Sequence, residues 1–359
     1  MTTTINNEHK KLNVPNLRLP EFQGEWKEYR IEDLTENISS GKCKSHSSNG
    51  EYNLYGSTGI IGKTDEACYE GNLVLVARVG ANAGFLQIIN EPCGITDNTL
   101  IIKPQKVGAQ YIYYYLQHFN LNRLIFGSGQ PLITGGMLKK VKVSLGNIQE
   151  QNKLTRLLSL LDERIATQNK IIDKLQSLIK GIRHDIFKDI QGEVLALSNI
   201  ADIYQPQTIS SSDLTSEGYW VYGANGIIGK YKEYNHETEQ ICITCRGNTC
   251  GTVNYTQPKV WITGNSMVIN TDKYQRQVNK RFLFHYLSSY KFKSIVSGSG
   301  QPQIVRTPLE KIKVVLPTIE KQVRIANSID IVSEKINTES SVLRLLEKQK
   351  QYLFRQMFI

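Results

Sequence analysis

The sequence predicts an α/β (α+β) fold in which two pseudo-twofold-related globular domains are separated by two long antiparallel coiled-coil helices. Three observations support this prediction. Apolar residues follow steps of three and four over residues 148–187, a spacing typical of a coiled coil. The same spacing recurs after a shift of 171 positions, from Leu158 to Ile329. A glycine-rich segment, residues 55–63, recurs at residues 222–230 and keeps seven of its nine residues.

The predicted helical spacers, residues 148–187 and 317–359, each carry one narrow apolar seam. About 39 residues at 1.5 Å each give a helix of roughly 58 Å. One layer is polar in both copies, with Gln168 in the first and Glu339 in the second. We expect the helices to pack through the following seam residues: Leu158, Leu161, Ile165, Ile172, Leu175, Ile179, Ile182, Ile329, Val332, Ile336, Leu343, Leu346 and Leu353.

A second set of apolar residues lies outside this seam: Leu154, Leu157, Leu160, Ile171 and Leu178. We expect these side chains on the outer faces of the helices, where apolar surface needs a partner. The sequence therefore predicts a chain that is most stable within a complex.

The remaining segments are predicted as an N-terminal tail and lead-in (1–19) and two globular domains (20–147 and 188–316). A chain of 359 residues suits two separate cores. Pro15 and Pro20 exclude a long helix in the lead-in, so we expect an extended segment pinned by Phe22 and Trp26.

Composition limits the class of protein. Lys and Arg total 43 against 33 Asp and Glu, a formal charge of +10 that favours a polyanionic partner. Six cysteines without an apolar leader predict reduced thiols and a cytoplasmic location. No apolar run approaches the roughly 18 residues that a membrane span needs.

Within the first domain, the pattern predicts strands at 73–79, 85–89, 95–102 and 140–145, and an amphipathic helix at 110–120. The second domain repeats this order, with its aromatic helix at 282–290. We match Arg246–Gly251 with Arg78–Gly84, one residue shorter.

Two segments resemble sites of chemistry, and each has a simpler explanation. Residues 57–64 nearly match a phosphate-binding loop, but Ser57 stands where that motif needs glycine. Cys242, Cys245 and Cys250 have a spacing that suits zinc, yet their counterparts in the first domain cannot bind metal. We therefore predict no catalytic residue and no metal ligand in this chain.

Polar, cationic and aromatic residues recur at the glycine-rich turns of both domains. Such side chains suit phosphate contacts and hydrogen bonds to base edges, although they also stabilise turns. Identical residues cannot distinguish two different half-sites, so discrimination is expected from residues 42–53 and 205–217, where the copies differ. The candidate DNA-binding residues are Tyr55, Lys63, Arg78, Asn98, Gln130, Tyr222, Lys230, Arg246, Asn265 and Gln301.

The order of domain, helix, domain, helix resembles the specificity (S) subunit of type I restriction–modification systems. Three motifs carry the resemblance over nearly the whole chain. They are Pro-Asn-Leu-Arg-Leu-Pro-Glu-Phe at 15–22, Gly-Ser-Gly-Gln-Pro-x-Ile at 127–133 and 298–304, and the helix openings Asn-Ile-Gln-Glu-Gln (147–151) and Thr-Ile-Glu-Lys-Gln (318–322).

This resemblance implies two target recognition domains, each recognising half of a bipartite sequence in double-stranded DNA. It implies that the helices set the spacer and dock two adenine methyltransferase (M) subunits, which two restriction (R) subunits with motor and nuclease activity can join. No cofactor is expected in this chain: S-adenosylmethionine would belong to the methyltransferase, and ATP and Mg²⁺ to the motor-nuclease subunit. Two alternatives stay open, a related system with fused methyltransferase and nuclease, and a coiled-coil scaffold without a DNA role.

Overall fold

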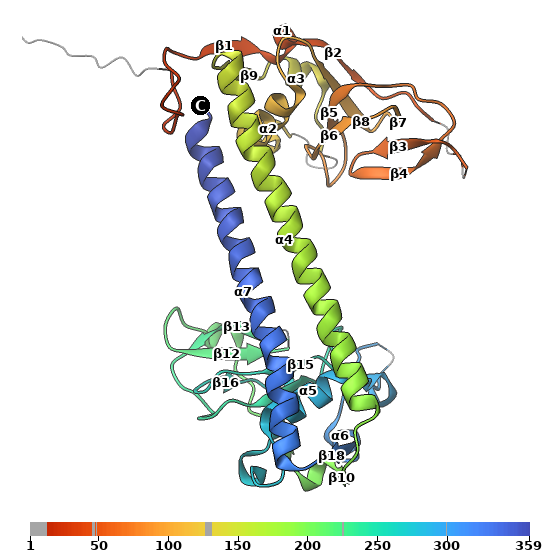
Figure 1. The fold of residues 1–359 in the computed structure, drawn as a ribbon, viewed down its shortest axis with the longest axis vertical. Coiled ribbons are helices and arrows are strands. Elements are labelled where there is room, and N and C mark those ends of the chain that lie inside the picture. Colours follow the sequence, from red (N-terminus) through yellow and green to blue (C-terminus); the bar gives the residue numbers. More distant parts are fainter. Residues whose placement is uncertain (1–12, 45–46, 48, 126–130, 225, 299) are drawn as a thin grey trace, which may run out of the picture. The chain divides into compact units, whose positions relative to one another are not determined.

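The computed structural model describes residues 13–44, 47, 49–125, 131–224, 226–298 and 300–359 (Figure 1). The chain divides into two compact units. The first comprises Met1–Gln168 with Val342–Ile359, and the second comprises Asn169–Ser341. The predicted domains 20–147 and 188–316 lie one in each unit, and each unit also contains part of both long helices, α4 (Ile148–Lys188) and α7 (Ile319–Met357).

The first unit contains three small sheets and the aromatic helix α2 (Ala109–Phe119). Its four-stranded sheet has the order β2-β8-β5-β6, its three-stranded sheet β4-β3-β7, and its two-stranded sheet β1-β9. The elements before α4 are β1 (Lys27–Arg30), α1 (Ile31–Leu34), β2 (Thr35–Ser40), β3 (Tyr52–Gly56), β4 (Gly59–Thr64), β5 (Asn72–Ala77), β6 (Leu86–Asn90), β7 (Cys93–Ile95), β8 (Thr99–Pro104), α2, η1 (Leu121–Leu124), α3 (Gly135–Lys139) and β9 (Lys142–Leu145).

The second unit repeats this topology, with sheets β11-β17-β14-β15, β13-β12-β16 and β10-β18. Its elements before α7 are β10 (Glu193–Ala196), η2 (Leu197–Asn199), β11 (Asp202–Tyr204), η3 (Ser211–Asp213), β12 (Tyr219–Gly223), β13 (Gly226–Tyr231), β14 (Ile241–Thr244), β15 (Val253–Tyr255), β16 (Trp261–Ile262), β17 (Ser266–Asn270), η4 (Asp272–Tyr274), α5 (Lys280–Ser289), η5 (Phe292–Ile295), α6 (Arg306–Glu310) and β18 (Lys313–Leu316).

One predicted strand is wrong. Residues 95–102 form the end of β7, a turn at 96–98 and the start of β8, which belong to different sheets. The chain leaves β7 because the Thr96 amide bonds the Tyr55 carbonyl oxygen and the Thr99 amide closes back on Thr96. Asp97 and Asn98, residue types that strands disfavour and turns favour, mark this break in the sequence, but the apolar and β-branched residues on both sides favoured a single strand.

The core of the first unit joins sheet, aromatic helix and both long helices. Tyr111 and Ile112 of α2 are buried with Leu158 of α4 and with Met357 and Phe358 at the C-terminal end. The direction follows from two sets of contacts: Arg18 binds Glu150 of α4 while the neighbouring Leu17 bonds Gln356 of α7, and farther along α4 Asp162 pairs with Lys350 of α7. The α4 and α7 segments of this unit therefore run antiparallel.

The lead-in is attached to both helices of the first unit. Trp26 is buried in the core, whereas Phe22 is half-buried beneath the Lys153 ammonium group of α4. Arg18 donates to the Glu150 carboxylate at 2.7 and 2.8 Å. The Leu17 amide bonds the Gln356 carbonyl oxygen. These contacts order the lead-in although it forms no helix or strand from residue 13 to 26.

The apolar set outside the seam divides into two groups. Leu154 is only 2% exposed and packs in the first core with the half-buried Leu157, so the prediction that these two face outward is wrong. Leu154 belongs to, and Leu157 packs against, the core cluster that includes the buried residues of α2, a tertiary packing that sequence periodicity alone does not reveal. Leu160, Ile171 and Leu178 are exposed. Within the described residues, no helix has the length and apolar character that a membrane span requires.

Candidate nucleic-acid interface

The shared glycine-rich segment forms an antiparallel hairpin in each unit, β3–β4 and β12–β13. Residues 57–64 therefore form a two-residue turn followed by strand β4 and do not enter a helix, which excludes the phosphate-binding loop of a nucleotide hydrolase there. The third strand of each small sheet, β7 or β16, runs parallel to the first. This arrangement places the hairpin beside the turn that follows β7 or β16.

The segments that differ between the copies are attached to these hairpins in the same way. The Ser47 amide bonds the Lys63 carbonyl oxygen at 2.9 Å, and the Thr215 amide bonds that of Lys230 at 2.8 Å. Residues 205–217 are mostly exposed along their length. Because these hydrogen bonds join backbone atoms, they do not depend on side chains. Two segments of different sequence can therefore attach to the same hairpin.

The turns after β7 and β16 bring Asn98 and Asn265 to equivalent exposed positions. The Asn98 carbonyl oxygen accepts the Arg78 amide at 2.9 Å, and that of Asn265 accepts the Cys245 amide at 3.0 Å. The structural counterpart of Arg78 is therefore Cys245, so the predicted match between Arg78 and Arg246 is wrong.

Further backbone bonds agree with this correction. Gly80 and Gly247 donate to the Pro131 and Pro302 carbonyl oxygens, which makes the two loops equal in length. Arg246 corresponds to Val79, because each forms an isolated antiparallel β-bridge with the residue that follows the Gly-Gln-Pro motif, Gln303 for Arg246 and Leu132 for Val79. The two arginines therefore lie one position apart in the repeat, and the hydrogen-bond register shows the true correspondence.

The other candidate residues occupy varied environments. Tyr55 is half-buried and donates to the Glu91 carboxylate at 2.6 Å, whereas Tyr222 is buried against the second unit's smaller core. Lys63 is exposed, and the Lys230 ammonium group lies 4.8 Å from the centre of the Trp220 ring. These tyrosines therefore support the hairpin, whereas Lys63 faces solvent and the half-buried Lys230 packs against an aromatic ring.

The remaining candidates do not form one cluster with them. Arg246 and Gln301 are exposed and Arg78 is half-buried, while Gln130 lies outside the described residues. Among the described members of this group, no hydrogen bond or ion pair joins one side chain to another.

The cysteines of the second unit are packing residues. Cys242 and Cys245 are buried, and burial raises the pKa of Cys242 to about 12, which disfavours the thiolate that a metal needs. Among the residues that the structure describes, no group of three or more His, Cys, Asp or Glu side chains is placed to hold a metal ion.

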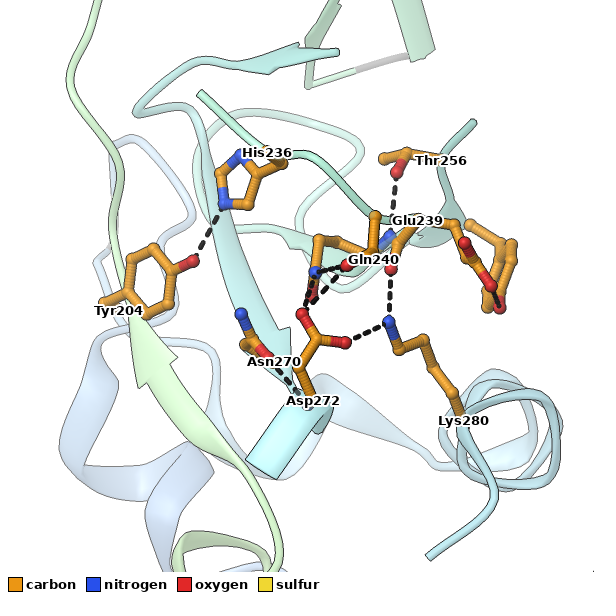
Figure 2. Close-up of polar contacts among 10 residues, drawn as sticks. Tyr204, His236, Glu239, Gln240, Thr256, Asn270, Asp272 and Lys280 are labelled. Carbon is orange, nitrogen blue, oxygen red and sulfur yellow. Dashed lines mark hydrogen bonds and ion pairs between the residues drawn. The ribbon is translucent and has the colours of Figure 1, made fainter. Parts of the chain in front are cut away.

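A polar network that includes Asp272, just after β17, stabilises the second unit (Figure 2). Lys280 of α5 donates to the Asp272 carboxylate at 2.6 Å, and the side-chain Nε2 of Gln240 donates to the same carboxylate at 2.9 Å. Nearby, the Tyr204 hydroxyl lies 2.8 Å from Nε2 of His236. The Asn235 side-chain atom that accepts the Ile262 amide must be its oxygen, and the same oxygen lies against Nδ1 of His236. Nδ1 of His236 therefore carries the proton and donates it to Asn235. Nε2 is then unprotonated and accepts the hydrogen bond from the Tyr204 hydroxyl.

A second buried histidine joins α5 to both long helices. Arg183 of α4 donates to Nδ1 of His285 at 2.9 Å, so Nε2–H of His285 donates to Asp330 of α7 at 2.8 Å. Arg281 forms a two-pronged contact with the same carboxylate. Burial would raise the pKa of Asp330, but the bonds from Arg281 and His285 bring it below its ordinary value.

The first unit uses different residues at the equivalent place. The Tyr114 hydroxyl of α2 donates to Asp162 of α4 at 2.9 Å, and Lys350 of α7 pairs with the same carboxylate at 2.5 Å. A polar network thus links each aromatic helix to both long helices, although in the first unit Lys350 reaches α2 only through Asp162.

Every predicted seam residue is buried or half-buried. In the first unit these are Leu158, Leu161, Ile165, Leu343, Leu346 and Leu353; in the second they are Ile172, Leu175, Ile179, Ile182, Ile329, Val332 and Ile336.

Comparison with known proteins gives one consistent result. The family model described as "Type I restriction modification DNA specificity domain" matches residues 23–177 and 190–348. A putative type I restriction enzyme specificity subunit (MjaX) from Methanocaldococcus jannaschii is 28% identical, covering 71% of this chain and 68% of that protein. Another specificity subunit from the same organism (MjaVIII) is 26% identical, covering 93% and 92%.

A solved structure shares the fold. The type I restriction–modification S subunit from M. genitalium superposes with a TM-score of 0.72 at 18% identity, covering 96% of this chain and 99% of that one. The two family matches together span most of the sequence and fall one on each copy of the repeat. The chain belongs to the family of type I restriction–modification specificity subunits and carries two target recognition domains.

Proposed function

We propose that this chain binds double-stranded DNA sequence-specifically, each domain recognising one half of a bipartite target. The supporting observation is an arrangement common to both units. In each, a segment that differs between the copies is attached by a backbone hydrogen bond to Lys63 or Lys230 of a hairpin that the copies share. A shared framework with differing loops suits two half-sites of different sequence on one polymer. The formal charge of +10 is compatible with a polyanionic partner.

The proposal also assigns the partners. The long helices set the spacer and dock two methyltransferase subunits, and restriction subunits join when the complex cleaves DNA. Exposed Leu160 and Leu178 of α4 and Ile331 of α7 are apolar surface available for docking. Catalysis and its cofactors, S-adenosylmethionine, ATP and Mg²⁺, belong to those subunits, while this chain supplies recognition.

Exchange of one domain tests this proposal. The segment between Glu21 and Val143 is replaced by that of a relative, and methylated adenines are mapped by single-molecule sequencing in cells that also produce the methyltransferase. We expect one half of the recognised sequence to change and the other half to stay. Exchange of residues 193–314 is the matched control and should change the other half. A methylome in which both halves change, or neither does, would contradict modular recognition.

A further inference from the structure

The two hairpins expose the same pair of isoleucines. Ile60 and Ile61 are 56% and 49% exposed, and their counterparts Ile227 and Ile228 are 47% and 49% exposed. Single exposed apolar residues are common on protein surfaces. Here two consecutive β-branched residues are exposed at the same place in both copies, where neither contributes to a core.

The backbone positions both pairs by the same irregularity. Tyr55 pairs with Ile60 and Leu54 with Gly62, which leaves Ile61 as an extra residue in β4. The second hairpin has the same bulge, with Ile228 unpaired between Ile227 and Gly229. A bulge redirects a side chain out of the regular alternation, and so accounts for two neighbouring exposed isoleucines.

A glycine makes room for the extra residue in each hairpin. A Cβ atom at Gly56 would lie 2.8 Å from Cγ2 of Ile61, and one at Gly223 would lie 2.9 Å from Cγ2 of Ile228. The isoleucine side chain therefore lies directly over the glycine backbone. The bulge and the glycine together determine where the isoleucine pair is exposed.

The hairpin tips are attached to the larger sheets by different side chains in the two units. In the first, Gln87 of β6 donates to the Gly56 carbonyl oxygen at 3.0 Å and to that of Ser57 at 3.2 Å. In the second, Thr244 donates to the Ala224 carbonyl oxygen and Ser266 to that of Gly223. Two different sets of bonds hold the same tip, which indicates that its position matters in both units.

DNA is the partner that these features favour. Lys63 and Lys230 follow two residues after these pairs on the same strands, so each apolar tip has a cation close in the chain for a phosphate, exposed at Lys63 and half-buried against Trp220 at Lys230. Two isoleucines are far below the roughly 800 Å² per partner that a stable protein interface needs. Isoleucine is, however, among the apolar residues that proteins insert into DNA grooves against base steps.

We propose that Ile60–Ile61 and Ile227–Ile228 are apolar DNA contacts, one in each half-site, that enter a groove and pack against sugars and base edges without selecting a sequence. This inference rests on the proposed function and adds a positioning role for the shared hairpin. The two parts of each domain then have different roles. The variable loop selects bases, and the isoleucine pair holds the duplex against that loop.

The test uses the full chain assembled with its methyltransferase and a duplex that carries the mapped target. The variants are Ile60→Thr with Ile61→Thr, and Ile227→Thr with Ile228→Thr. Threonine keeps the β-branched shape that suits a strand. We expect each double variant to bind the target about tenfold more weakly, since roughly 1.4 kcal/mol of apolar contact is lost. The methylated sequence and the salt dependence of binding should stay unchanged, because no charge is removed.

Val194→Thr is the matched control, because Val194 is 59% exposed on a strand of the second unit but is not shared with the first. Its affinity should equal that of the unaltered complex. Unchanged DNA affinity in both isoleucine variants would overturn the inference. So would weaker assembly with the methyltransferase, seen by mass photometry without DNA, because it would place the isoleucines at a protein interface. If the unaltered complex itself fails to bind its target, the proposed function fails instead.

Discussion

The second unit should lose stability in mildly acidic solution because it buries two neutral histidines. His236 is 6% exposed and His285 is fully buried. In both, burial is the main cause that lowers the pKa to about 4 from an ordinary value of 6.5. The groups that face His285 are Arg183, Arg281 and Asp330, and its two ring nitrogens are already occupied.

Acid destabilises the second unit because these histidines bind protons more tightly in the unfolded state than in the folded state. In the unfolded chain each of these histidines takes up a proton near pH 6.5, whereas in the folded chain it is protonated only near pH 4. Between these pH values the unfolded chain binds more protons, so acid favours unfolding. The contribution of these histidines is complete above pH 6.5 and is lost as the pH falls toward 4. At pH 5 each histidine should lower the free energy of unfolding by about 2 kcal/mol relative to pH 7.5.

Hydrogen exchange followed by mass spectrometry can measure this unit by unit. After correction for intrinsic exchange, amides of β14 and α5 should lose protection at pH 5, and more than those of β5 and α2. Variants His236→Gln and His285→Gln remove the titration and keep an amide that can donate or accept. Combined, they should flatten the pH dependence although protection at pH 7.5 falls. Equal protection of the second unit at both pH values, or an undiminished pH dependence in the double variant, would refute the reasoning.

Three further predictions concern the lead-in, a sheet junction and the spacer. Arg18→Ala leaves the buried Glu150 carboxylate without its cation and should cost the first unit about 3 kcal/mol in a denaturant melt, with partial recovery on adding Glu150→Gln. Gly94→Ala should cost about 1–3 kcal/mol in the same assay, since its Cβ would lie 2.8 Å from Thr64 Cγ2 and 2.9 Å from Cys43 Sγ. Inserting one heptad after Gln168 and one after Glu339 adds about 10 Å to each helix. The gap between methylated half-sites should then lengthen by about three base pairs, and an unchanged gap in the sequenced methylome would show that the helices do not set it.

Sequence patterns predicted those features that local chemistry determines. The three-four spacing identified α4, which runs from Ile148 to Lys188, and the helix pattern at 110–120 identified α2 to within one residue at each end. The repeat predicted the common topology, because two copies with the same apolar pattern bury the same faces. The break at 96–98 was missed although Asp97 and Asn98 favour a turn, because the residues on both sides favour a strand; the bond that holds the turn comes from Tyr55, about 40 positions earlier in the chain.

The candidate interface was predictable only in part. The glycine-rich turns were correctly placed between strands, but the exposed isoleucine pairs had no distinguishing signal, since apolar residues in a strand usually face a core. The bulges that expose them depend on pairing with the neighbouring strand, which composition does not record. A usable signal did exist: two adjacent isoleucines between glycines, present in both copies, depart from the alternation expected of a half-buried strand.

The differences between the two copies also bear on how freely a domain can be exchanged. Tyr114 binds Asp162 in the first unit, whereas His285 binds Asp330 in the second, so the attachment chemistry has diverged while the topology has stayed the same. An incoming domain brings its own α2 helix but meets the resident Asp162 and Lys350. If that helix presents an apolar residue in place of Tyr114, the half-buried Asp162 loses a hydrogen bond and the domain is held less firmly. Modularity therefore depends on one side chain of α2 as well as on the variable loops.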